Sequence, residues 1–368
     1  MGGAWRYVDA GAVTPFENVA IMPVLSRQVA ETGRPVVMTS VWGQTHLNVG
    51  WFDDVDATLD LAAAADRGVA VIRRPLYGGG TAFYDAGCAV MWGYLLPKGG
   101  EWDDLDAALE RFAPSFETTL RRLDLGGVRF EGSSDLRWND RKLGAMTAQD
   151  VVACVSVGGF LNTAPPDLDL YLAVARVPDE KFADKVVKDL REYVCTAAEV
   201  RGRPLPYEEF RDALVASLDD AGFDLVDEPL DDAERTGVTK IAAKVGSDDA
   251  IRRISSDRFR AAAPAGSRVG FGNHKGRKLC RAGVALDSGT GAIVAAMLAG
   301  DMHVSPPDIL DRAADTLVGA TADDRAGLAA RLSSVFDGDD VHQAEAAMGI
   351  TTDDLVVAVE KAVAAAWA

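Results

Sequence analysis

The segment Val69-Ala-Val-Ile-Arg-Arg-Pro-Leu-Tyr-Gly-Gly-Gly-Thr-Ala-Phe-Tyr-Asp-Ala-Gly-Cys88 is the most informative part of the sequence. An apolar, β-branched run leads into two arginines, three glycines follow, and a second apolar run leaves, which predicts strand, loop, strand. Gly78, Gly79 and Gly80 lack a Cβ and tolerate positive φ, so backbone N–H groups can approach an anion closely. The guanidinium groups of Arg73 and Arg74 suit carboxylate or phosphate oxygens. Taken alone, the segment favours a tight hairpin with surface arginines, so an anion site needs support elsewhere in the chain.

The composition is that of a soluble globular chain: 368 residues, 48% of them hydrophobic, are enough for two domains. No apolar run approaches the roughly 20 residues that span a bilayer, and the N-terminus lacks a signal-peptide core. We therefore expect a cytoplasmic protein without membrane association. A net charge of −18 argues against nucleic acid as the main partner, because phosphate binding needs clustered positive charge. The four cysteines show no CxxC spacing, which argues against a zinc site or a disulfide framework.

Strand-like and helix-like segments alternate in the first half of the chain. Thr14-Pro-Phe-Glu17 is a capping box ahead of residues with helical periodicity. The expected strands cover residues 5–9, 35–42, 45–52 and 89–96 and the hairpin 127–131 with 134–138, and the expected helices cover 18–31, 56–67 and 102–123. This order predicts the fold class α/β (α+β), with mixed β-sheets flanked by helices.

The second half divides at a linker. Before it we expect a strand over residues 151–162, helices over 176–191, 207–221 and 239–259, and an acidic connector over 224–234. Phe210, Leu214 and Leu218 fall on the core side of the helix 207–221. The composition shifts at residues 261–267, the best linker candidate. Beyond it we expect a hairpin (275–286 with 291–301), helices over 305–317 and 323–336, and a last helix capped by Thr351 or Thr352. The predicted domains are 1–262 and 263–368, the second a small α+β domain.

Three motifs resemble the lipoate-protein ligase family, within the biotin/lipoate ligase superfamily. The glycine segment is similar to its RRxSGGGxVxHDxG signature, with Tyr77, Tyr84 and Cys88 where serine, histidine and asparagine are usual. Asp135-Leu, followed by Arg141-Lys-Leu-Gly-Ala-Met-Thr-Ala-Gln149, resembles NDL and GRKISGSAQ. The third, Arg176-Val-Pro-Asp-Glu-Lys-Phe-Ala-Asp-Lys-Val-Val-Lys-Asp-Leu-Arg191, resembles RVPxEKxxDKGVKSVRxRV. Residues from 274 onward resemble the family's accessory domain, so the resemblance covers nearly the whole chain.

The resemblance implies a biotin/lipoate-ligase-like catalytic domain with a fused C-terminal accessory domain. Such a ligase forms lipoyl-AMP from lipoate and ATP and transfers the lipoyl group to a lysine of a carrier domain. Lys142 matches the lysine that holds the substrate carboxyl oxygen and the α-phosphate, and it is the implied catalytic residue. Attack of a carboxylate on ATP brings two anions together, and a fixed ammonium group lowers that barrier. Mg²⁺ is expected to bridge the phosphates.

The resemblance also assigns the groups around the acyl-adenylate. The implied binding residues are Arg74, Gly78, Gly79, Gly80, Tyr84 and Asp135. Arg74 would clamp oxygens, the glycines would shape the cleft, and Asp135 would contact the adenylate or Mg²⁺. The candidates for an apolar slot around the dithiolane are Trp42, Val49 and Tyr84. Asp53 falls near a position where the family has glutamine, and His46 is interpreted as a surface or packing residue.

Three lysines are candidates for carrier binding. Lys181, Lys185 and Lys188 lie at i, i+4 and i+7, so a helix would carry all three on one side. A solvated helix face is the plain interpretation of any one of them, whereas the set suits an acidic carrier domain. The implied carrier is a 2-oxoacid dehydrogenase E2 or a glycine-cleavage H-like protein. We expect the chain to be a monomer.

Alternatives to the ligase stay open. One is an ATP-independent octanoyl or lipoyl transferase with a cysteine nucleophile, for which Cys88 and Cys154 lie near the motifs, although buried strand cysteines are usually inert. Another is a catalytically weak protein that binds a lipoyl group or its carrier, suggested by Tyr77, Tyr84 and Gly158 in place of polar residues. A biotin ligase is disfavoured because the basic GRGRxGR loop is absent.

Overall fold

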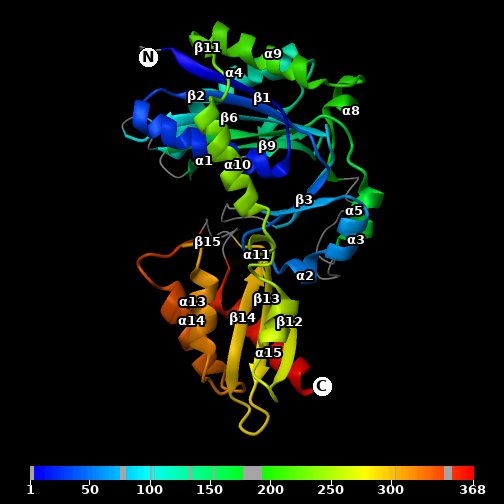
Figure 1. Ribbon diagram of the computed structural model, residues 1–368, viewed down its shortest axis with the longest axis vertical. Coiled ribbons are helices and arrows are strands. Elements are labelled where there is room, and N and C mark those ends of the chain that lie inside the picture. Colours follow the sequence, from blue (N-terminus) through cyan, green and yellow to red (C-terminus); the bar gives the residue numbers. More distant parts are fainter. Residues whose placement is uncertain are drawn as a thin grey trace. The chain divides into compact units, whose positions relative to one another are not determined.

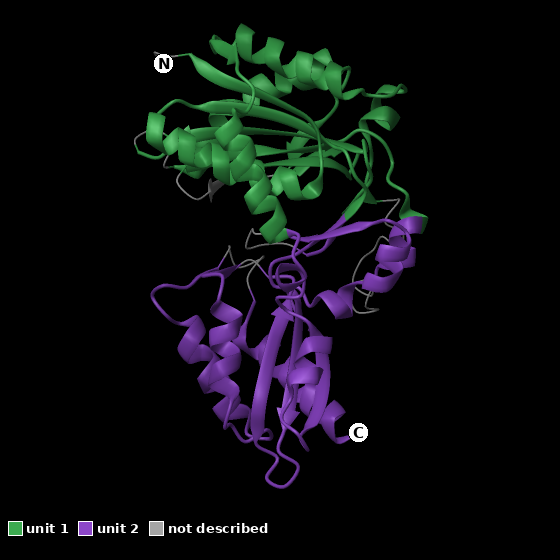
Figure 2. Cartoon of the chain, viewed as in Figure 1, with its two compact units in different colours: residues 1–46, 83–169, 186–245 green, residues 47–82, 170–185, 246–368 purple. Residues whose placement is uncertain are grey.

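The computed structural model describes residues 4–74, 80–99, 102, 104–131, 135–151, 154–176, 193–302, 304–343 and 350–368, the side chains of 149–151 excepted (Figure 1). The chain forms two compact units, each assembled from separate pieces of sequence (Figure 2). The first unit contains residues 1–46, 83–169 and 186–245, and the second contains 47–82, 170–185 and 246–368. The predicted domain boundary after residue 262 lies inside the second unit, and as a boundary between domains it stays a prediction.

An eight-stranded mixed sheet organises the first unit, in the order β11-β1-β2-β6-β10-β9-β8-β7. Its strands are β1 (Trp5–Val13), β2 (Val36–Trp42), β6 (Ala89–Pro97), β7 (Arg129–Glu131), β8 (Asp135–Trp138), β9 (Arg141–Val151), β10 (Cys154–Asn162) and β11 (Leu225–Asp227). Strand β1 pairs in parallel with β2 and β11, and the other neighbours are antiparallel. The predicted mixed sheet with flanking helices is confirmed.

Helices cover both faces of this sheet (Figure 1). They are α1 (Pro15–Thr32), α4 (Leu105–Arg122), α8 (Ala197–Arg201), α9 (Tyr207–Asp220) and α10 (Asp232–Val245). Because side chains alternate along β6, Trp92 and Tyr94 belong to the core beneath α4 and α9, whereas Met91 and Leu95 belong to the core beneath α1 and α10. Trp92 stacks on Phe116 with ring centroids 4.1 Å apart.

Local signals in the sequence explain several of these helices. Thr14 and Glu17 form the expected capping box at the start of α1, since each side chain accepts from the other's backbone N–H. In α9 the side chains of Phe210, Leu214 and Leu218 are fully buried, as the helical spacing predicts.

The second unit contains an antiparallel sheet, β12-β13-β14, with helices of the C-terminal part packed on it. The elements are β12 (Arg268–Lys275), β13 (Leu279–Leu286), β14 (Ile293–Gly300), α13 (Ile309–Leu317), α14 (Arg325–Phe336) and α15 (Thr352–Trp367), with a short ribbon of β15 (Val304–Ser305) and β16 (His342–Gln343). Helix α15 lies directly on β12: a Cβ on Gly270 would stand 2.1 Å from the Ala362 carbonyl oxygen. Glycine in that strand therefore permits the close approach.

A second small sheet has the order β4-β3-β5. Its strands are β3 (His46–Val49), β4 (Ala70–Arg73) and β5 (Ala82–Tyr84), and the boundaries between the units fall within β3 and β5. Two short helices, α2 (Val55–Thr58) and α3 (Leu61–Asp66), lie between β3 and β4 in the sequence, and further short helices are α5 (Leu168–Val174), α11 (Asp248–Ile251) and α12 (Ser256–Ala262). The predicted strand, loop, strand order of the glycine segment is confirmed at its described ends.

Three expectations about secondary structure are wrong in detail. The predicted helix over residues 56–67 is divided into two short helices, because the first ends with Leu59 as its C-cap and the second begins with Asp60 as its N-cap. Residues 239–259 belong to three helices, of which α11 and α12 begin at serine N-caps. The acidic connector 224–234 contains β11 and the start of α10. The predicted helix over 176–191 lies outside the described residues from residue 177 onward.

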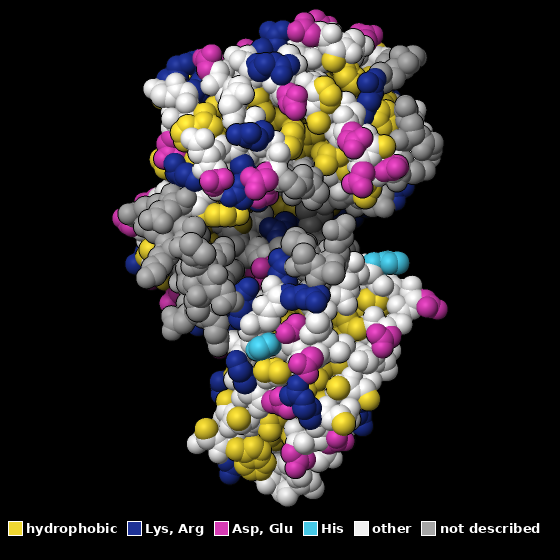
Figure 3. Space-filling view, turned by 180° about the vertical axis from the view of Figure 1, so that it is seen from behind, with side chains coloured by type: hydrophobic (Ala, Val, Ile, Leu, Met, Phe, Trp, Pro, Cys, Tyr) yellow, Lys and Arg dark blue, Asp and Glu magenta, His cyan; other side chains and the backbone are white. Residues whose placement is uncertain are grey.

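In the described part of the chain, no helix combines the length and apolarity that crossing a membrane requires. On the face shown in Figure 3, Lys and Arg side chains are interspersed with Asp and Glu side chains. The net negative charge of the chain is therefore not gathered into one patch on that face.

Candidate active site

A hairpin of the first unit carries Asp135 and Lys142, the two residues of the second motif. Asn139 and Asp140 connect β8 to β9 with φ values of 47° and 61°, the backbone that a two-residue type I′ turn requires. Trp138 and Arg141 pair across the turn. Lys142 is thus the second residue of strand β9.

Asp135 and Lys142 form an ion pair near the surface. The Nζ atom of Lys142 donates to Oδ1 of Asp135 at 2.7 Å, and the two side chains are 27% and 23% exposed. The other carboxylate oxygen lies 4.0 Å from Nη1 of Arg137. A partly solvated pair is weak enough to be exchanged for a charged ligand, so the ammonium group is available for an incoming anion.

The backbone of residues 193–195 lies alongside the start of β9. The Lys142 carbonyl accepts from the N–H of Cys195 at 3.0 Å, and Lys142 and Val194 form a parallel bridge. Arg141 adds a bond from Nη2 to the Val194 carbonyl at 2.5 Å and an ion pair with Glu199 at 3.2 Å. These contacts fix the backbone at Lys142, and its ammonium group pairs with Asp135 among the residues that the structure describes.

The stem of the glycine loop, defined as Arg73, Arg74, Gly80 and Thr81, lies in the second unit. The N–H of Arg74 donates to the Val49 carbonyl at 2.9 Å, and its Nη2 donates to the Gly80 carbonyl at 3.3 Å. Gly78, Gly79 and Tyr77 lie outside the described residues. Lys142 belongs to the first unit and the three glycines belong to the second. That they meet around one ligand therefore stays a prediction.

Arg73 has a structural role that the sequence did not indicate. Its side chain is buried, and its guanidinium donates to the carbonyl oxygens of Gly50, Trp51, Asp53, Ala250, Ile251 and Ile254 at 2.7–3.2 Å. Burial lowers the pKa of Arg73 to about 10, against the opposing influence of Asp53. The sequence analysis suggested that Arg73 and Arg74 both bind an anionic ligand. Arg73 instead holds backbone segments together.

Three aromatic rings of the first unit, those of Trp42, His46 and Phe160, gather around Tyr84. Trp42 and His46 lie 4.3 Å apart between ring centroids, His46 stacks on Tyr84 at 5.4 Å, and Phe160 meets Tyr84 edge-on at 5.8 Å. Trp42 and Tyr84 were both assigned to the dithiolane slot, and they do lie together, 5.4 Å between centroids. Val49 is buried at the end of β3 in the second unit.

His46 belongs to this cluster as a buried, neutral ring. Its Nδ1 lies 2.9 Å from the Gln44 carbonyl, so Nδ1 carries the proton and Nε2 is an acceptor. Burial lowers the pKa of His46 to about 4. Neither Nε2 of His46 nor Nε1 of Trp42 has a hydrogen-bond partner among the described residues. The sequence predicted a surface or packing histidine, and the structure buries His46 in the packed cluster.

Every cysteine of the chain is buried: Cys88, Cys154, Cys195 and Cys280. Desolvation raises the pKa of the Cys88 and Cys280 thiols to about 12, and it raises that of Cys195 as well. The thiolate is the nucleophilic form, so burial works against nucleophilic chemistry at these residues.

The described residues hold no group of three or more His, Cys, Asp or Glu side chains that could bind a metal ion. Mg²⁺ bound to a nucleotide usually needs only one or two carboxylates besides the phosphates. Asp135 supplies one such carboxylate next to Lys142, so the residues present fit a magnesium ion held mainly by phosphate oxygens.

The predicted carrier-binding residues Lys181, Lys185 and Lys188 lie outside the described residues. Arg176, just before them, is described: its Nη1 donates to the Asp56 carbonyl at 2.8 Å, and its Nη2 lies 3.9 Å from Oδ2 of Asp60. Arg176, the first residue of the third motif, is therefore held by residues of the second unit.

The model of the lipoyl protein ligase A/B catalytic domain matches residues 14–219. The chain belongs to this family. Octanoyltransferase LipM from Geobacillus kaustophilus is 24% identical over 274 residues, which cover 67% of this chain and 96% of that protein. The family resemblance inferred from the motifs is thereby confirmed.

Solved structures share the fold of this family member. The bi-partite lipoate protein ligase of Thermoplasma acidophilum, described with its E2 lipoyl domain, superposes with a TM-score of 0.58 at 18% identity, over 69% of this chain and 98% of that chain. LipL1 of P. falciparum in complex with lipoate gives 0.60 at 12% identity, over 93% of this chain and 96% of that chain. The fold class expected from the sequence is confirmed by both.

Proposed function

We propose that this family member is an ATP-dependent lipoate-protein ligase that makes lipoyl-AMP and passes the lipoyl group to a lysine of a carrier domain. The observation that carries the choice is the burial of all four cysteines. An ATP-independent acyl transferase of the kind weighed above needs an accessible thiolate, and none of the four thiols is accessible. An adenylating ligase needs a placed cation, and Lys142 is one.

The proposed reaction has two steps. A carboxylate oxygen of lipoate attacks the α-phosphorus of ATP, the bond from that phosphorus to the bridging oxygen breaks, and pyrophosphate leaves. The ε-amine of the carrier lysine then attacks the acyl carbon, AMP leaves with the electron pair of the C–O bond, and the amine loses a proton to solvent. Both steps place negative charge on oxygens near the α-phosphate, where a fixed ammonium group stabilises the transition state.

Lys142 would change partners during the first step. Its ammonium group forms an ion pair with Asp135, and both side chains are partly exposed to solvent. An incoming carboxylate and α-phosphate offer the same kind of partner, so the exchange keeps the cation paired throughout. Bound Mg²⁺, with Asp135 as its protein ligand, would neutralise phosphate charge that one lysine and Arg74 leave uncompensated.

The aromatic cluster of Trp42, His46 and Tyr84 is the proposed place for the acyl chain. Aromatic faces favour the polarisable sulfurs of a dithiolane. The turn that follows Tyr84 at the end of β5 is held in place, because Thr45 Oγ1 donates to Asp85 Oδ1 at 3.0 Å and the Gly87 N–H donates to the Trp42 carbonyl at 2.7 Å. The slot residues are thereby held in one arrangement.

A lipoyl carrier domain is the proposed partner. The Thermoplasma ligase was described together with its E2 lipoyl domain, which supports a partner of the same kind for this chain. Lys181, Lys185 and Lys188 are the proposed contact for its acidic surface. Charge reversal at Lys185 and Lys188 should slow lipoyl transfer more than adenylate formation, whereas equal loss in both half-reactions would contradict the assignment.

An octanoyltransferase is the second candidate, favoured by the likeness to LipM over nearly all of that protein. The nucleophile candidates are Cys88 and Cys154, and Cys195 joins them because its N–H donates to the Lys142 carbonyl. Two assays separate the candidate functions: lipoate-dependent pyrophosphate release from ATP, and acyl transfer from an octanoyl thioester without ATP. The ligase predicts the first activity, unchanged by Cys88→Ala, Cys154→Ala or Cys195→Ala. Lipoate binding without either activity would instead favour the catalytically weak protein that binds a lipoyl group or its carrier.

A further inference from the structure

Both ends of the glycine loop are attached to one buried residue, Asp53. Its side chain is 3% exposed, and Oδ2 accepts a hydrogen bond from Thr81 Oγ1 at 2.9 Å. Its backbone carbonyl accepts from Nη1 of Arg73 at 2.8 Å. Arg73 precedes the segment 74–80 and Thr81 follows it. One residue thus holds the entry and the exit of the loop that the family motif places at the ligand.

The turn that presents Asp53, residues 50–54, is itself fixed to the C-terminal part of the second unit. The Phe52 side chain is buried among core residues of β13, β14 and α13, and its carbonyl accepts from the Gly300 N–H at 2.8 Å. Nε1 of Trp51 donates to the Pro307 carbonyl at 2.9 Å, and the Arg253 guanidinium lies 4.6 Å from the Trp51 ring. Asp53 therefore stands on a base that side-chain packing and backbone bonds both hold.

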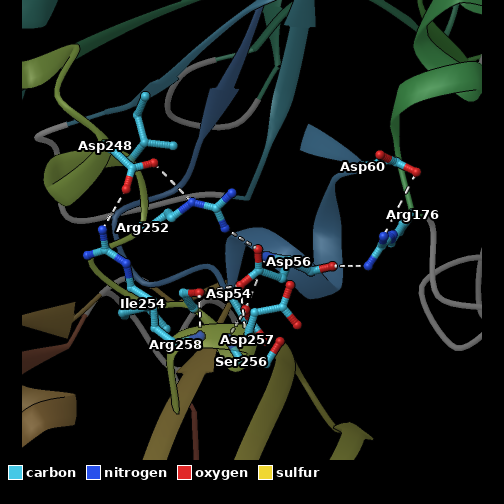
Figure 4. Close-up of polar contacts among 12 residues, drawn as sticks. Asp54, Asp56, Asp60, Arg176, Asp248, Arg252, Ile254, Ser256, Asp257 and Arg258 are labelled. Carbon is cyan, nitrogen blue, oxygen red and sulfur yellow. Dashed lines mark hydrogen bonds and ion pairs between the residues drawn. The ribbon is translucent and has the colours of Figure 1, made fainter. Parts of the chain in front are cut away.

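The residues after Asp53, which are Asp54 at the end of the turn and the first residues of α2, bind a second segment, as the close-up in Figure 4 shows. The N–H of Ser256 donates to Asp54 Oδ1 at 2.9 Å, and Arg252 Nη1 donates to Asp56 Oδ1 at 2.9 Å. The N–H of Val55 donates to the Ile254 carbonyl at 3.1 Å. Because Arg73 also bonds to the carbonyls of Ile251 and Ile254, the turn, the loop stem and residues 250–257 form one bonded assembly.

We propose that Asp53 is a positioning residue for adenylation, which fixes the loop stem, and through it the Arg74 guanidinium, on a base built by the C-terminal part of the chain. The inference rests on the proposed function, because it gives Arg74 a role at the acyl-adenylate. A clamp loses most of its effect when it is misplaced by about 1 Å, so the bonds that hold its backbone matter for rate without touching the ligand.

Two interactions of Asp53 can be separated by substitution. Thr81→Val removes the hydroxyl donor at constant volume, and Thr81→Ser keeps the hydroxyl. Asp53→Asn keeps an oxygen acceptor for Thr81 but removes the negative charge that supports the Arg73 guanidinium. Thr118→Val is the matched control, since the Thr118 hydroxyl donates to the Pro114 carbonyl and accepts from Nη2 of Arg121 on the exposed side of α4, in the first unit.

The test measures two quantities in full-length protein: hydrogen exchange of peptides spanning residues 73–84, and KM and kcat for lipoyl-AMP formation. Thr81→Val should speed exchange in those peptides and raise KM for ATP about tenfold, with Thr81→Ser and Thr118→Val close to wild type. Wild-type exchange and KM in Thr81→Val would overturn the proposal, as would a Thr81→Ser variant as impaired as Thr81→Val. Hydrogen exchange does not depend on turnover. If the wild-type protein formed no adenylate, the proposed function would be refuted, and the exchange data would still show whether Asp53 fixes the loop stem.

Discussion

Lys142 and Arg73 stand in two motifs of the same family, and the structure treats the two cations in opposite ways. Lys142 is partly exposed and bound to one carboxylate. Arg73 is 2% exposed and enclosed by backbone carbonyls from residues 50–53 and 250–254. A cation bound to a solvated carboxylate can exchange it for a substrate anion, whereas a cation that satisfies buried carbonyls cannot leave them. The nature and burial of a residue's partners, more than its place in a motif, indicate whether it faces the ligand.

Loss of the Lys142 ammonium group should have the largest effect. Lys142→Ala is expected to lower kcat for lipoyl-AMP formation about 100- to 1,000-fold, because one positioned charge at the developing oxyanion is removed. Stability should change little, since the side chain is partly solvated. Stopped reactions analysed by mass spectrometry measure the adenylate, and urea unfolding is the control. Near-normal turnover would show that Lys142 takes no part in the mechanism, and the proposed difference in role between Lys142 and Arg73 would then be wrong.

Arg73→Met should act on stability. Six carbonyl oxygens would lose a buried donor, so we expect the free energy of unfolding to fall by about 3 kcal/mol or more. Arg74→Met, the neighbouring substitution, should change stability by less than about 1 kcal/mol while lowering adenylate formation. Chemical denaturation of both variants measures the difference. Equal stability of the two variants would show that Arg73 is not a structural residue.

His46 is a third case, a buried base whose Nε2 has no partner in the described part of the chain. Its pKa is about 4 in the folded chain and about 6.5 when unfolded, so the unfolded state takes up the proton first as the pH falls. The stabilisation from a neutral His46 is complete above pH 6.5 and is lost towards pH 4. Between pH 7 and pH 5, wild type should lose about 2 kcal/mol more than His46→Phe. Urea unfolding at both pH values measures this, and identical losses would mean that His46 titrates normally.

Asp135→Asn should have the smallest of these effects and the most specific one. An amide oxygen still accepts from Lys142, but the charge that holds the ammonium in place is gone. We expect kcat/KM for ATP to fall about tenfold, because the variant loses both the charge that places Lys142 and the carboxylate proposed for Mg²⁺. Steady-state pyrophosphate release at varied ATP measures both constants. Unchanged kcat and KM would remove Asp135 from the candidate site.

The fold could be predicted wherever a local rule governs a segment. The Thr14 capping box, the apolar side of α9 and the turn at Asn139 and Asp140 each follow from residues close in sequence. Strand β11 was missed because its three residues are held by parallel pairing with β1, more than two hundred positions away. Strand β12 was missed because Gly270 and Gly272 weaken a strand pattern, and their purpose becomes visible only with α15 packed on them.

The candidate site was predictable to the level of motifs. Lys142 and Asp135 were selected together, and the structure joins them in one ion pair. The role of Arg73 could not be predicted, because its partners at residues 250–254 lie far along the chain and are backbone atoms without a sequence signature. The contact between Thr81 and Asp53 could not be predicted for the same reason, since a single hydrogen bond from a hydroxyl to a carboxylate leaves no pattern in either segment.

The central claim is that this chain activates lipoate through ATP at Lys142. Purified protein incubated with ATP, Mg²⁺ and lipoate, with lipoyl-AMP and pyrophosphate measured together, tests it most directly. The account predicts that both products form in wild type and in the Cys88→Ala, Cys154→Ala and Cys195→Ala variants, and that both form about 100- to 1,000-fold more slowly in Lys142→Ala. Acyl transfer from an octanoyl thioester without ATP, abolished by one of these cysteine substitutions and accompanied by no adenylate in wild type, would contradict it.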